Sequence, residues 1–272
     1  MKLGLVPNKP LHKTLKLAYL LNEHNPDVVL LTEVGGLHSL EAFNYYFLGD
    51  EYIVICPPSN SNRGIDLGIL IKKNLPYQHT VTNILQFEKE GKKKDFNRNL
   101  LQLSLISNGV VLLNFFVVHL KSKLDFERKD FWGLKARTAE VNGLIKILNQ
   151  QKTPFILGGD FNGNASLYNT DFEFLPLYLA ENQFVMKDVL ELAEIPLEER
   201  FTHHYFKSGY RRSSQLDYLF LSEALWEKMD KKSSYAIRYL GEYGEKIDPP
   251  ATLQEKQSFP SDHNPLMVNL NL

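Results

Sequence analysis

Two polar side chains follow a short apolar run near the middle of the chain. Residues 154–164 read Pro-Phe-Ile-Leu-Gly-Gly-Asp-Phe-Asn-Gly-Asn, and the run from Phe155 to Leu157 predicts a short buried strand. Asp160 and Asn162 lie two positions apart after this run, so both can face one side and hold one small charged group. The glycines beside them let another backbone, or a phosphate, approach closely. Asp, Asn and Gly are also common in turns, so this segment alone does not establish a site.

The same pattern recurs at the ends of other apolar runs. Polar residues with this placement are, in chain order, Glu33, His119, Asp217, Asp262 and His263. Each has an ordinary structural explanation, such as a turn cap or a histidine satisfied in the core. A buried carboxylate such as Asp217, however, is unfavourable without a partner. Taken together with Asp160 and Asn162, the series predicts one shared site rather than several unrelated turns.

These side chains must be positioned by the strands and helices around them. The spacing of apolar residues predicts one helix from Leu11 to near Asn25 and a longer amphipathic helix from Phe131 to Leu148. Strands are expected at Val28–Thr32, Tyr52–Cys56, Leu67–Lys72, Leu100–Ile106, Val110–His119, Phe155–Leu157, Leu216–Leu221 and Leu266–Leu270. Several of these runs are apolar on both faces, which indicates sheets that are covered on each side. We therefore expect an α/β fold with stacked sheets flanked by helices.

Composition narrows the class of protein. The chain has 272 residues, 43% of them hydrophobic, so it can bury a substantial core in one large or two small domains. Its net charge of −1 gives no overall attraction to nucleic acid or to an acidic membrane. Cys56 is the only cysteine, which excludes an intrachain disulfide and a cysteine-based zinc cluster. No apolar run is long enough for a transmembrane segment, and no signal peptide is seen. A cytoplasmic protein is therefore expected, with the N-terminus either complete or truncated.

Two stretches read as surface structure. The charged segment from Glu88 to Asp95 lies between two apolar runs and predicts a solvated hairpin loop. The irregular segment from Leu240 to Pro260 contains Pro249-Pro250 and predicts a surface excursion that serves as a lid or substrate loop.

The motifs resemble one known family. Pro26-Asp27 followed by Glu33, His119-Leu120, Gly159-Asp-Phe-Asn162, Asp217-Tyr218 and Ser261-Asp-His263 are similar, in this order, to the endonuclease/exonuclease/phosphatase superfamily of deoxyribonuclease-I-like fold. The segments 63–68 and 119–123 resemble bacterial members with no assigned substrate. Because the resemblance covers nearly the whole chain, it implies a single domain over residues 1–272. The fold it implies is a four-layer sandwich, in which two mixed β-sheets pack face to face between helices.

The residue types also suit phosphoester hydrolysis, which needs an attacking water, charge neutralisation on the phosphoryl oxygens and help for the leaving group. The carboxylate of Glu33 suits Mg²⁺, with Mn²⁺ as a substitute, and Asp262 is placed to join the metal site. Asp160 can accept a proton from the attacking water, while Asn162 donates to a phosphoryl oxygen. Asp217 is expected to pair with His263 and favour its imidazolium form.

The remaining candidate site residues are supported by fewer observations. The resemblance implies that His119 is a phosphate ligand or a proton donor to the leaving oxygen, and Asp66 is a candidate to orient it. Arg63 and Arg98 are candidates for phosphate contact, although a surface salt bridge explains each equally well. Members of the family begin with a strand that ends in an Asn at the metal site. Either Asn8 fills this position from a minimal first strand, or that strand is missing and its sheet carries an unpaired edge.

Three functions stay open at this point. The first is a Mg²⁺-dependent phosphodiesterase, expected to be a nuclease with nucleic acid as its partner. The second is a phosphatase or sphingomyelinase-like enzyme acting on a small or lipid-linked phosphoester, and the third is a non-catalytic member with an incomplete metal site. Local positive charge occurs at Lys92–Lys94, Lys121, Lys123 and Arg211-Arg212, but each of these is also typical of a solvated loop. No obligate protein partner is indicated.

Overall fold

The computed structural model describes residues 9–272 except 90, 124–129, 208–209, 242–243 and 246. The α-helices are α1 (Leu11–His24), α2 (Leu37–Phe47), α3 (Leu134–Leu148), α4 (Val189–Leu192) and α5 (Leu253–Ser258). The strands are β1 (Val28–Val34), β2 (Tyr52–Ile55), β3 (Asp66–Lys72), β4 (Gln78–Lys89), β5 (Lys92–Ser107), β6 (Val110–His119), β7 (Phe155–Asp160), β8 (Met186–Asp188), β9 (His203–Lys207), β10 (Tyr210–Ser214), β11 (Asp217–Ser222), β12 (Tyr235–Ala236) and β13 (Leu266–Met267). Short 3-10 turns include η1 (Phe131–Gly133) and η2 (Phe172–Tyr178).

Two larger sheets organise these strands. One has six strands in the order β4-β5-β6-β7-β11-β8, and its β6–β7 pair is parallel whereas the other pairs are antiparallel. The other has three antiparallel strands in the order β1-β3-β2. The described residues also form two-stranded ribbons from β9 with β10 and from β12 with β13.

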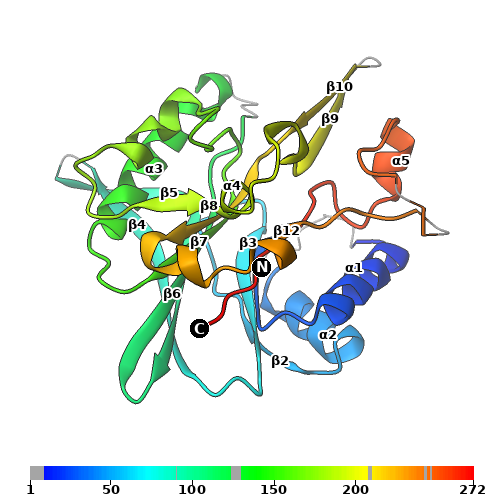
Figure 1. The fold of residues 1–272 in the computed structure, drawn as a ribbon, viewed down its shortest axis with the longest axis horizontal. Coiled ribbons are helices and arrows are strands. Elements are labelled where there is room, and N and C mark those ends of the chain that lie inside the picture. The colour runs from blue at the N-terminus through cyan, green and yellow to red at the C-terminus, as the bar shows by residue number, and fades with distance from the viewer. Residues whose placement is uncertain (1–8, 90, 124–129, 208–209, 242–243, 246) are drawn as a thin grey trace.

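Three apolar clusters show how the layers stack. The cluster between the two sheets joins Leu67 and Ile69 of β3 to Leu101 and Leu103 of β5. On the outer face of the six-stranded sheet, α3 and η2 pack over a second cluster, and α1 and α2 cover a third on the outer face of the small sheet. Figure 1 shows this sequence of layers, with α3 on one side of the molecule and α1 and α2 on the other. The predicted sheets between helices are confirmed.

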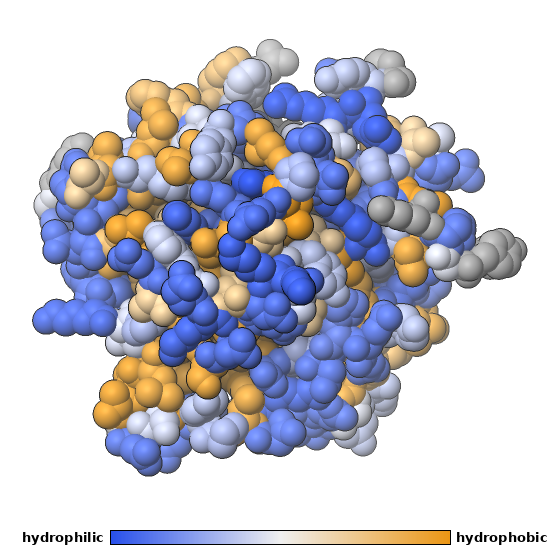
Figure 2. Space-filling view, viewed as in Figure 1, coloured by the Kyte–Doolittle hydropathy of each residue, from blue (hydrophilic) through white to orange (hydrophobic). Residues whose placement is uncertain are grey.

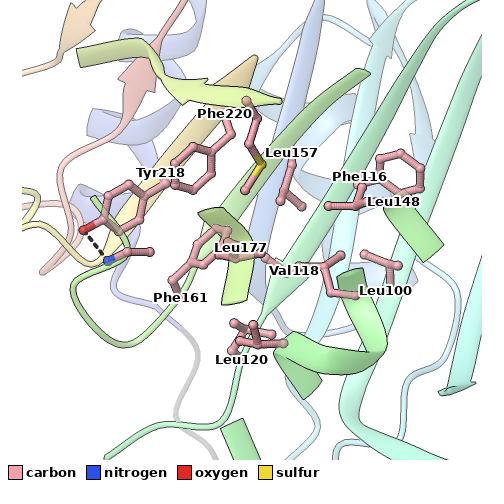
Figure 3. Close-up of a cluster of buried hydrophobic side chains, with 14 of the residues drawn as sticks. Leu100, Phe116, Val118, Leu120, Leu148, Leu157, Phe161, Leu177, Tyr218 and Phe220 are labelled. Carbon is pink, nitrogen blue, oxygen red and sulfur yellow. Dashed lines mark hydrogen bonds between the residues drawn. The ribbon is translucent and has the colours of Figure 1, made fainter. Parts of the chain in front are cut away.

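The cluster beneath α3 contains the aromatic residue of the Asp-Phe-Asn motif. Figure 3 shows Phe161 among Leu177, Val118 and the rings of Tyr218 and Phe220. Phe161 is fully buried and meets the Tyr218 ring edge-on, with centroids 5.3 Å apart. Truncation of such a residue to alanine costs about 3–5 kcal/mol. Burial of Phe161 therefore fixes the chain direction between Asp160 and Asn162.

Several predicted elements need correction. The helix expected from Phe131 begins at Leu134, because Phe131 lies in η1 and is 76% exposed. The segment from Glu88 to Asp95 belongs to a hairpin as predicted, but strand pairing extends into it, from Gln86 with Asp95 to Lys89 with Lys92. The last strand is shorter than expected and covers only Leu266–Met267. Helix α2 and the largely exposed edge strand β4 were not predicted.

The outer edge of β1 lines a large cavity. Among the described residues β1 pairs only with β3, and its other edge faces a cavity of about 520 Å³. Residues 264–270 form the opposite side of this cavity, and Lys9 also lines it. Asn8 lies outside the described residues, so its predicted role as a metal ligand stays a prediction.

The far end of the long sheet is a plain apolar hairpin. Val110, Val111 and Leu112, at the start of β6, are 61%, 38% and 44% exposed. Figure 2 shows apolar surface at the lower left, where Figure 1 places the β5–β6 hairpin. The candidate catalytic residues lie at the other end of β6. No helix in the described part of the chain is both long and apolar enough to cross a membrane.

Candidate active site

Three predicted residues form one row across neighbouring strands. His119 at the end of β6 is in register with Asp160 at the end of β7, and Asp160 is in register with Asp217 at the start of β11. Side chains of residues directly opposite each other lie on the same face of a sheet. His119 Nε2 accordingly lies 3.5 Å from Asp160 Oδ2. The sheet therefore brings together residues that are far apart in sequence.

The two glycines before Asp160 allow this close approach. Gly159 has a φ of +132°, and a Cβ built on it would lie 1.9 Å from the Val118 carbonyl oxygen. A Cβ on Gly158 would lie 2.6 Å from the Leu219 side chain. The glycines were expected to admit either a backbone or a phosphate, and their close neighbours are the backbone and side chains of adjacent strands.

The turn after β7 ties Asp160 to Asn162. The Asn162 backbone N–H donates to Asp160 Oδ1 at 2.7 Å, and the Asn162 side-chain amide donates to Asp160 Oδ2 at 3.0 Å. The same amide also donates to the Leu120 carbonyl at 3.0 Å. Beyond the turn, the Ala165 N–H donates to the Tyr218 hydroxyl, as the dashed line in Figure 3 shows. Asn162 thus connects the carboxylate of Asp160 to the end of β6.

Asp217 and His263 form the predicted pair. His263 Nδ1 lies 2.7 Å from Asp217 Oδ2, and the Thr202 hydroxyl donates to the same oxygen at 2.7 Å. Thr202 Oγ1 also accepts the N–H groups of Leu216 and Asp217, both at 3.0 Å. The Tyr239 hydroxyl donates to the His263 carbonyl, which fixes the other end of this residue. Both members of the pair are therefore held in place.

The charges around Asp160 and His263 move their pKa values in a useful direction. Burial, together with the neighbouring carboxylates of Asp217 and Glu33, raises the pKa of Asp160 to about 7 against the opposing effects of His263 and of the Asn162 N–H. Burial lowers the pKa of His263, but its hydrogen-bonded partner Asp217, with Asp160 and Asp262, outweighs burial and raises this pKa to about 10. At neutral pH His263 is an imidazolium, and Asp160 can take up or release a proton.

His119 differs from His263 in charge. Burial, together with the cations Arg98, His263 and Arg63, lowers the pKa of His119 to about 3, so its imidazole is neutral. Its Nδ1 is buried without a hydrogen-bond partner in the part of the chain that the structure describes. The suggested orienting residue Asp66 instead accepts hydrogen bonds from the backbone and hydroxyl of Ser59. The proposal that Asp66 orients His119 is thus not supported.

The two candidate arginines lie on the His119 side of the site. Arg98 is only 6% exposed, and its Nη1 donates to the Leu120 carbonyl at 3.4 Å. Neither Arg98 nor Arg63 has an ion pair within 4.0 Å among the described residues. The alternative of a surface salt bridge is therefore not what the structure shows for Arg98.

Glu33 enters the site from the small sheet on an unusual backbone. The pairing of β1 with β3 has a bulge between Leu31 and Val34, and Glu33 within it has a φ of +57°. Left-handed backbone is uncommon for residues other than glycine, and bulges commonly redirect a side chain near a site. The Glu33 carboxylate is exposed, with no hydrogen bond to another described residue, and it raises the pKa of Asp160 by repulsion.

Asp262 lies beside two lysines that sequence reasoning did not identify. Its carboxylate lies 4.0 Å from Lys256 Nζ, and 61% of its side chain is exposed. Burial raises the pKa of Asp262, but the positive charges of His263 and Lys256 outweigh it, so the pKa lies below its usual value. The ammonium of Lys9 donates to the Pro260 carbonyl, and its pKa is influenced by both Asp262 and Glu33. Asp262 and Glu33 therefore share one electrostatic environment.

Two further side chains join the site from β9 and α5. The ring of His203, at the start of β9, lies beside that of His263, tilted by 49° with centroids 4.7 Å apart. Lys256, on α5, lies 3.2 Å from His203 Nε2 and donates to the His204 carbonyl. Neither follows an apolar run, so the pattern that found the other residues could not find them. The only sequence signal was the location of Lys256 in the irregular segment from Leu240 to Pro260, which was expected to act as a lid or substrate loop; no such signal pointed to His203.

The predicted positive spots do not form one patch. Lys92–Lys94 lie at the turn end of the β4–β5 hairpin, whereas Lys123 pairs with Asp171 at 3.1 Å after β6. Arg211 donates to the Pro250 carbonyl, and Arg212 lies beside it on β10. Only the groups after β6 and on β10 lie on segments next to the site.

Comparisons with known proteins establish the family of the chain. A model of the Endonuclease/Exonuclease/phosphatase family matches residues 6–263, and the chain belongs to this family. It is accordingly a phosphoester hydrolase. The enzymes of this family depend on divalent metal ions. Two clusters of the described residues could hold one, the first made of His203, Asp262 and His263 and the second of Asp160, Asp217 and His263.

Solved structures share the fold at low sequence identity. Humanized TDP2 from D. rerio is 19% identical with a TM-score of 0.64, covering 98% of this chain and 95% of its own. A family protein from Leptotrichia buccalis C-1013-b is 17% identical with a TM-score of 0.64, covering 99% and 96%. The human nocturnin catalytic domain with a bound sulfate anion is 16% identical with a TM-score of 0.62, covering 96% and 87%. No curated protein sequence matched the chain.

The donor groups fit a hard divalent cation. Carboxylate oxygens are the ligands that Mg²⁺ prefers, and it commonly takes one or two of them while keeping several waters. The exposed carboxylate of Glu33 has no hydrogen bond to another described residue, it repels Asp160, and both it and Asp262 raise the pKa of Lys9. A cation placed among these groups would relieve that repulsion.

Proposed function

We propose that the protein is a Mg²⁺-dependent phosphodiesterase, and specifically a nuclease, that cleaves by in-line attack of water. The observation that carries this proposal is the row of His119, Asp160 and Asp217 across β6, β7 and β11, extended by His263. This row combines a carboxylate with a pKa near neutrality and a fixed imidazolium. A general base with a pKa near the working pH and a fixed positive charge both favour phosphoester cleavage at neutral pH.

Each residue of the row has a task that its environment suits. Asp160 takes the proton of the attacking water, because a general base works best when its pKa lies near the working pH. His263 stays charged and stabilises the negative charge that develops on the phosphoryl oxygens. The neutral His119 acts as a hydrogen-bonding phosphate ligand rather than as the acid for the leaving group, because its pKa of about 3 disfavours a bound proton.

The remaining residues bind and orient the phosphate. Asn162 holds the Asp160 carboxylate toward the attacking water, and its amide can turn from Asp160 to a phosphoryl oxygen once substrate is bound. The guanidinium groups of Arg98 and Arg63 supply positive charge on the His119 side. Arg98 is the stronger candidate of the two because it is buried beside Leu120 at the end of β6.

Glu33 and Asp262 would hold the metal ion, with Asn8 as a further ligand outside the described residues. Mg²⁺ is the expected ion and Mn²⁺ a substitute, since both prefer oxygen ligands. When bound, the ion neutralises charge on the phosphoryl and leaving oxygens. Lys9 offsets the negative charge of both Glu33 and Asp262, and Lys256 offsets that of Asp262.

Two observations bear on the substrate. In favour of nucleic acid, a D. rerio TDP2 structure of the same fold is a complex with single-strand DNA product. In favour of a lipid-linked phosphoester, the stacked rings of Phe131 and Trp132 are 76% and 62% exposed on the segment that follows His119. Aromatic side chains of this kind also occur at membrane interfaces. We favour nucleic acid and keep the lipid-linked phosphoester as the second candidate.

Hydrolysis of small chromogenic esters tests the chemistry separately from the natural substrate. We expect the protein to cleave bis-p-nitrophenyl phosphate in Mg²⁺ and to cleave the corresponding monoester poorly. Asp160→Asn and His263→Ala should each lose most of this activity. Equal rates for the two variants and the unaltered protein would contradict the assignment. A preference for the monoester would favour a phosphatase.

A further inference from the structure

The β9–β10 hairpin is an arm that leads directly away from the catalytic histidine. Figure 1 shows the hairpin projecting from the body of the molecule. At its base His203 forms an isolated bridge to His263, and their rings lie in contact with centroids 4.7 Å apart. From there the hairpin continues to Lys207 on β9 and returns from Tyr210 on β10. An elongated molecule bound at His263 could therefore also contact this hairpin.

One face of the hairpin alternates aromatic and cationic side chains. Tyr205 is directly opposite Arg212, and Lys207 is directly opposite Tyr210. Because directly paired residues share a face and every second residue returns to it, these four side chains lie on the same face as His203. Tyr205 and Tyr210 are 51% and 65% exposed, and Lys207 and Arg212 are exposed as well. Steps along this face are about 7 Å.

The opposite face is already occupied by the protein. His204 is buried, with Nδ1 2.9 Å from the Ser213 hydroxyl and Nε2 2.9 Å from Asp248. Arg211 donates to the Pro250 carbonyl, which joins this face to the segment that carries α5. The hairpin is therefore anchored from one side, and the face with the two tyrosines is the one that a ligand can reach.

We propose that this face binds a single-stranded nucleic acid next to the scissile phosphate, with bases stacked on Tyr205 and Tyr210 and phosphates paired with Arg212 and Lys207. This inference rests on the proposed nuclease function and names its substrate class. Flat rings alternating with cations complement a chain in which flat bases alternate with phosphates. Bases inside a duplex are not available for such stacking, so a single strand is selected.

The composition of the face argues against a lipid surface. Membrane-binding surfaces combine a continuous apolar area with cations at its border, whereas each tyrosine on this face is directly opposite a cation. The arm also begins at His203, beside the catalytic pair, rather than at the exposed Phe131 and Trp132 on the segment after β6. Nucleic acid therefore fits both the chemistry and the position of the arm.

Binding of a fluorescein-labelled oligo(dT) of about 12 nucleotides, measured by anisotropy in EDTA, tests the stacking directly. Tyr205→Ala/Tyr210→Ala should weaken binding at least about 10-fold, since stacking on one aromatic residue contributes about 5- to 150-fold. The matched control, Tyr45→Ala/Tyr46→Ala, removes two exposed tyrosines from α2 and should bind like the unaltered protein. An abasic strand of the same length should not distinguish the tyrosine variant from the control.

The contribution of Lys207 and Arg212 can be recognised separately from the salt dependence of binding. Lys207→Gln/Arg212→Gln should weaken binding and lower the slope of log affinity against log salt by about 1.4, for two lost phosphate contacts on a single strand. Binding of all variants with equal affinity would overturn the proposal. So would binding of the unaltered protein to phosphatidylcholine–phosphatidylserine vesicles, through Tyr205 and Tyr210, with no binding of oligo(dT).

A kinetic ratio separates this proposal from the proposed function. In Mg²⁺, the ratio of kcat/KM for the oligonucleotide to kcat/KM for bis-p-nitrophenyl phosphate should fall at least about 10-fold in the double tyrosine variant. An unaltered protein that cleaves neither substrate would contradict the nuclease function. Cleavage of both substrates with an unchanged ratio in the variant would leave that function standing and overturn the role of the arm.

Discussion

The two walls of the site are built differently. The sheet wall, which we define as His119, Asp160, Asn162, Asp217 and His263, is tied together by hydrogen bonds within and between neighbouring strands. The metal wall, which we define as Glu33 and Asp262, consists of two exposed carboxylates near lysines. The fold alone orders the first wall. The second carries repulsion that a cation would relieve, so the two walls should respond differently to mutation and to metal.

The largest effect is expected in the sheet wall at Asp160. Asp160→Asn should lower kcat for bis-p-nitrophenyl phosphate by about 100- to 10,000-fold, the usual contribution of a general base. High Mg²⁺ should not restore the rate, because the substitution removes the proton acceptor.

The same variant provides its own test of folding. At pH 8 the neutral amide removes a buried charge, because the pKa of Asp160 is raised to about 7, but it also replaces one of the two oxygens that accept from Asn162 by a donor. These effects oppose each other, so the melting temperature at pH 8 should change little. A large drop in melting temperature together with the loss of rate would mean that Asp160 is structural instead.

A smaller effect of a different kind is expected in the metal wall. Glu33→Gln should raise the Mg²⁺ concentration for half-maximal activity by about 10- to 100-fold, because an amide oxygen is a weaker ligand than a carboxylate. Raising the metal concentration should recover most of the rate. Activity measured across a Mg²⁺ titration checks this, and an unchanged midpoint would contradict the placement of Glu33 in the metal wall.

Thr202 tests how the sheet wall is held together. Thr202→Val removes the hydroxyl that donates to Asp217 and accepts two backbone N–H groups, so it should destabilise the fold by about 1–3 kcal/mol. We expect kcat to fall as well, because His263 loses a fixed partner. Thr202→Ser keeps the hydroxyl and is the matched control. If serine and valine behave alike in urea unfolding and in kcat, the hydroxyl is not the group that matters.

The smallest effect concerns pH. Since Asp217 helps raise the pKa of folded His263 to about 10, above the value of about 6.5 for an unperturbed histidine, the folded state binds the proton more tightly. The stability from this pair is fully present below pH 6.5 and is lost as pH rises through 10. Urea unfolding at pH 6.5 and 9.5 should show a loss of at least about 1 kcal/mol. His263→Gln should lose less unfolding free energy between these two pH values. If both proteins lose the same amount, His263 is not the source of the pH dependence.

The two walls also differed in how far the sequence predicted them. Asp160 and Asp217 could be placed because each adjoins an apolar run, and a strand brings the end of such a run to a sheet edge. The bulge that turns Glu33 into the site depends on the pairing of β1 with β3, which no local pattern encodes. The positions of Asp160 and Asp217 followed from local sequence, whereas the left-handed backbone at Glu33 did not.

Residues that reach the site only through tertiary contacts were not predicted. Thr202 and His203 reach the site through pairing of β9 with other segments, and Lys256 arrives on α5 after an irregular stretch. The bonds of the Asn162 amide to Asp160 and Leu120 were also unforeseen, since a donor for the phosphate was expected to be free. These features depend on distances between segments, and spacing along the sequence does not contain them.

The central claim is that the two walls act on one phosphoester with separate tasks. The most direct test is the rate of bis-p-nitrophenyl phosphate hydrolysis against Mg²⁺ concentration for Glu33→Gln and Asp217→Asn. We predict that Glu33→Gln moves the midpoint to higher Mg²⁺ and approaches the original maximum. Asp217→Asn should lower the maximum without moving the midpoint. The opposite pattern, or the same change in both variants, would contradict the division into a metal wall and a sheet wall.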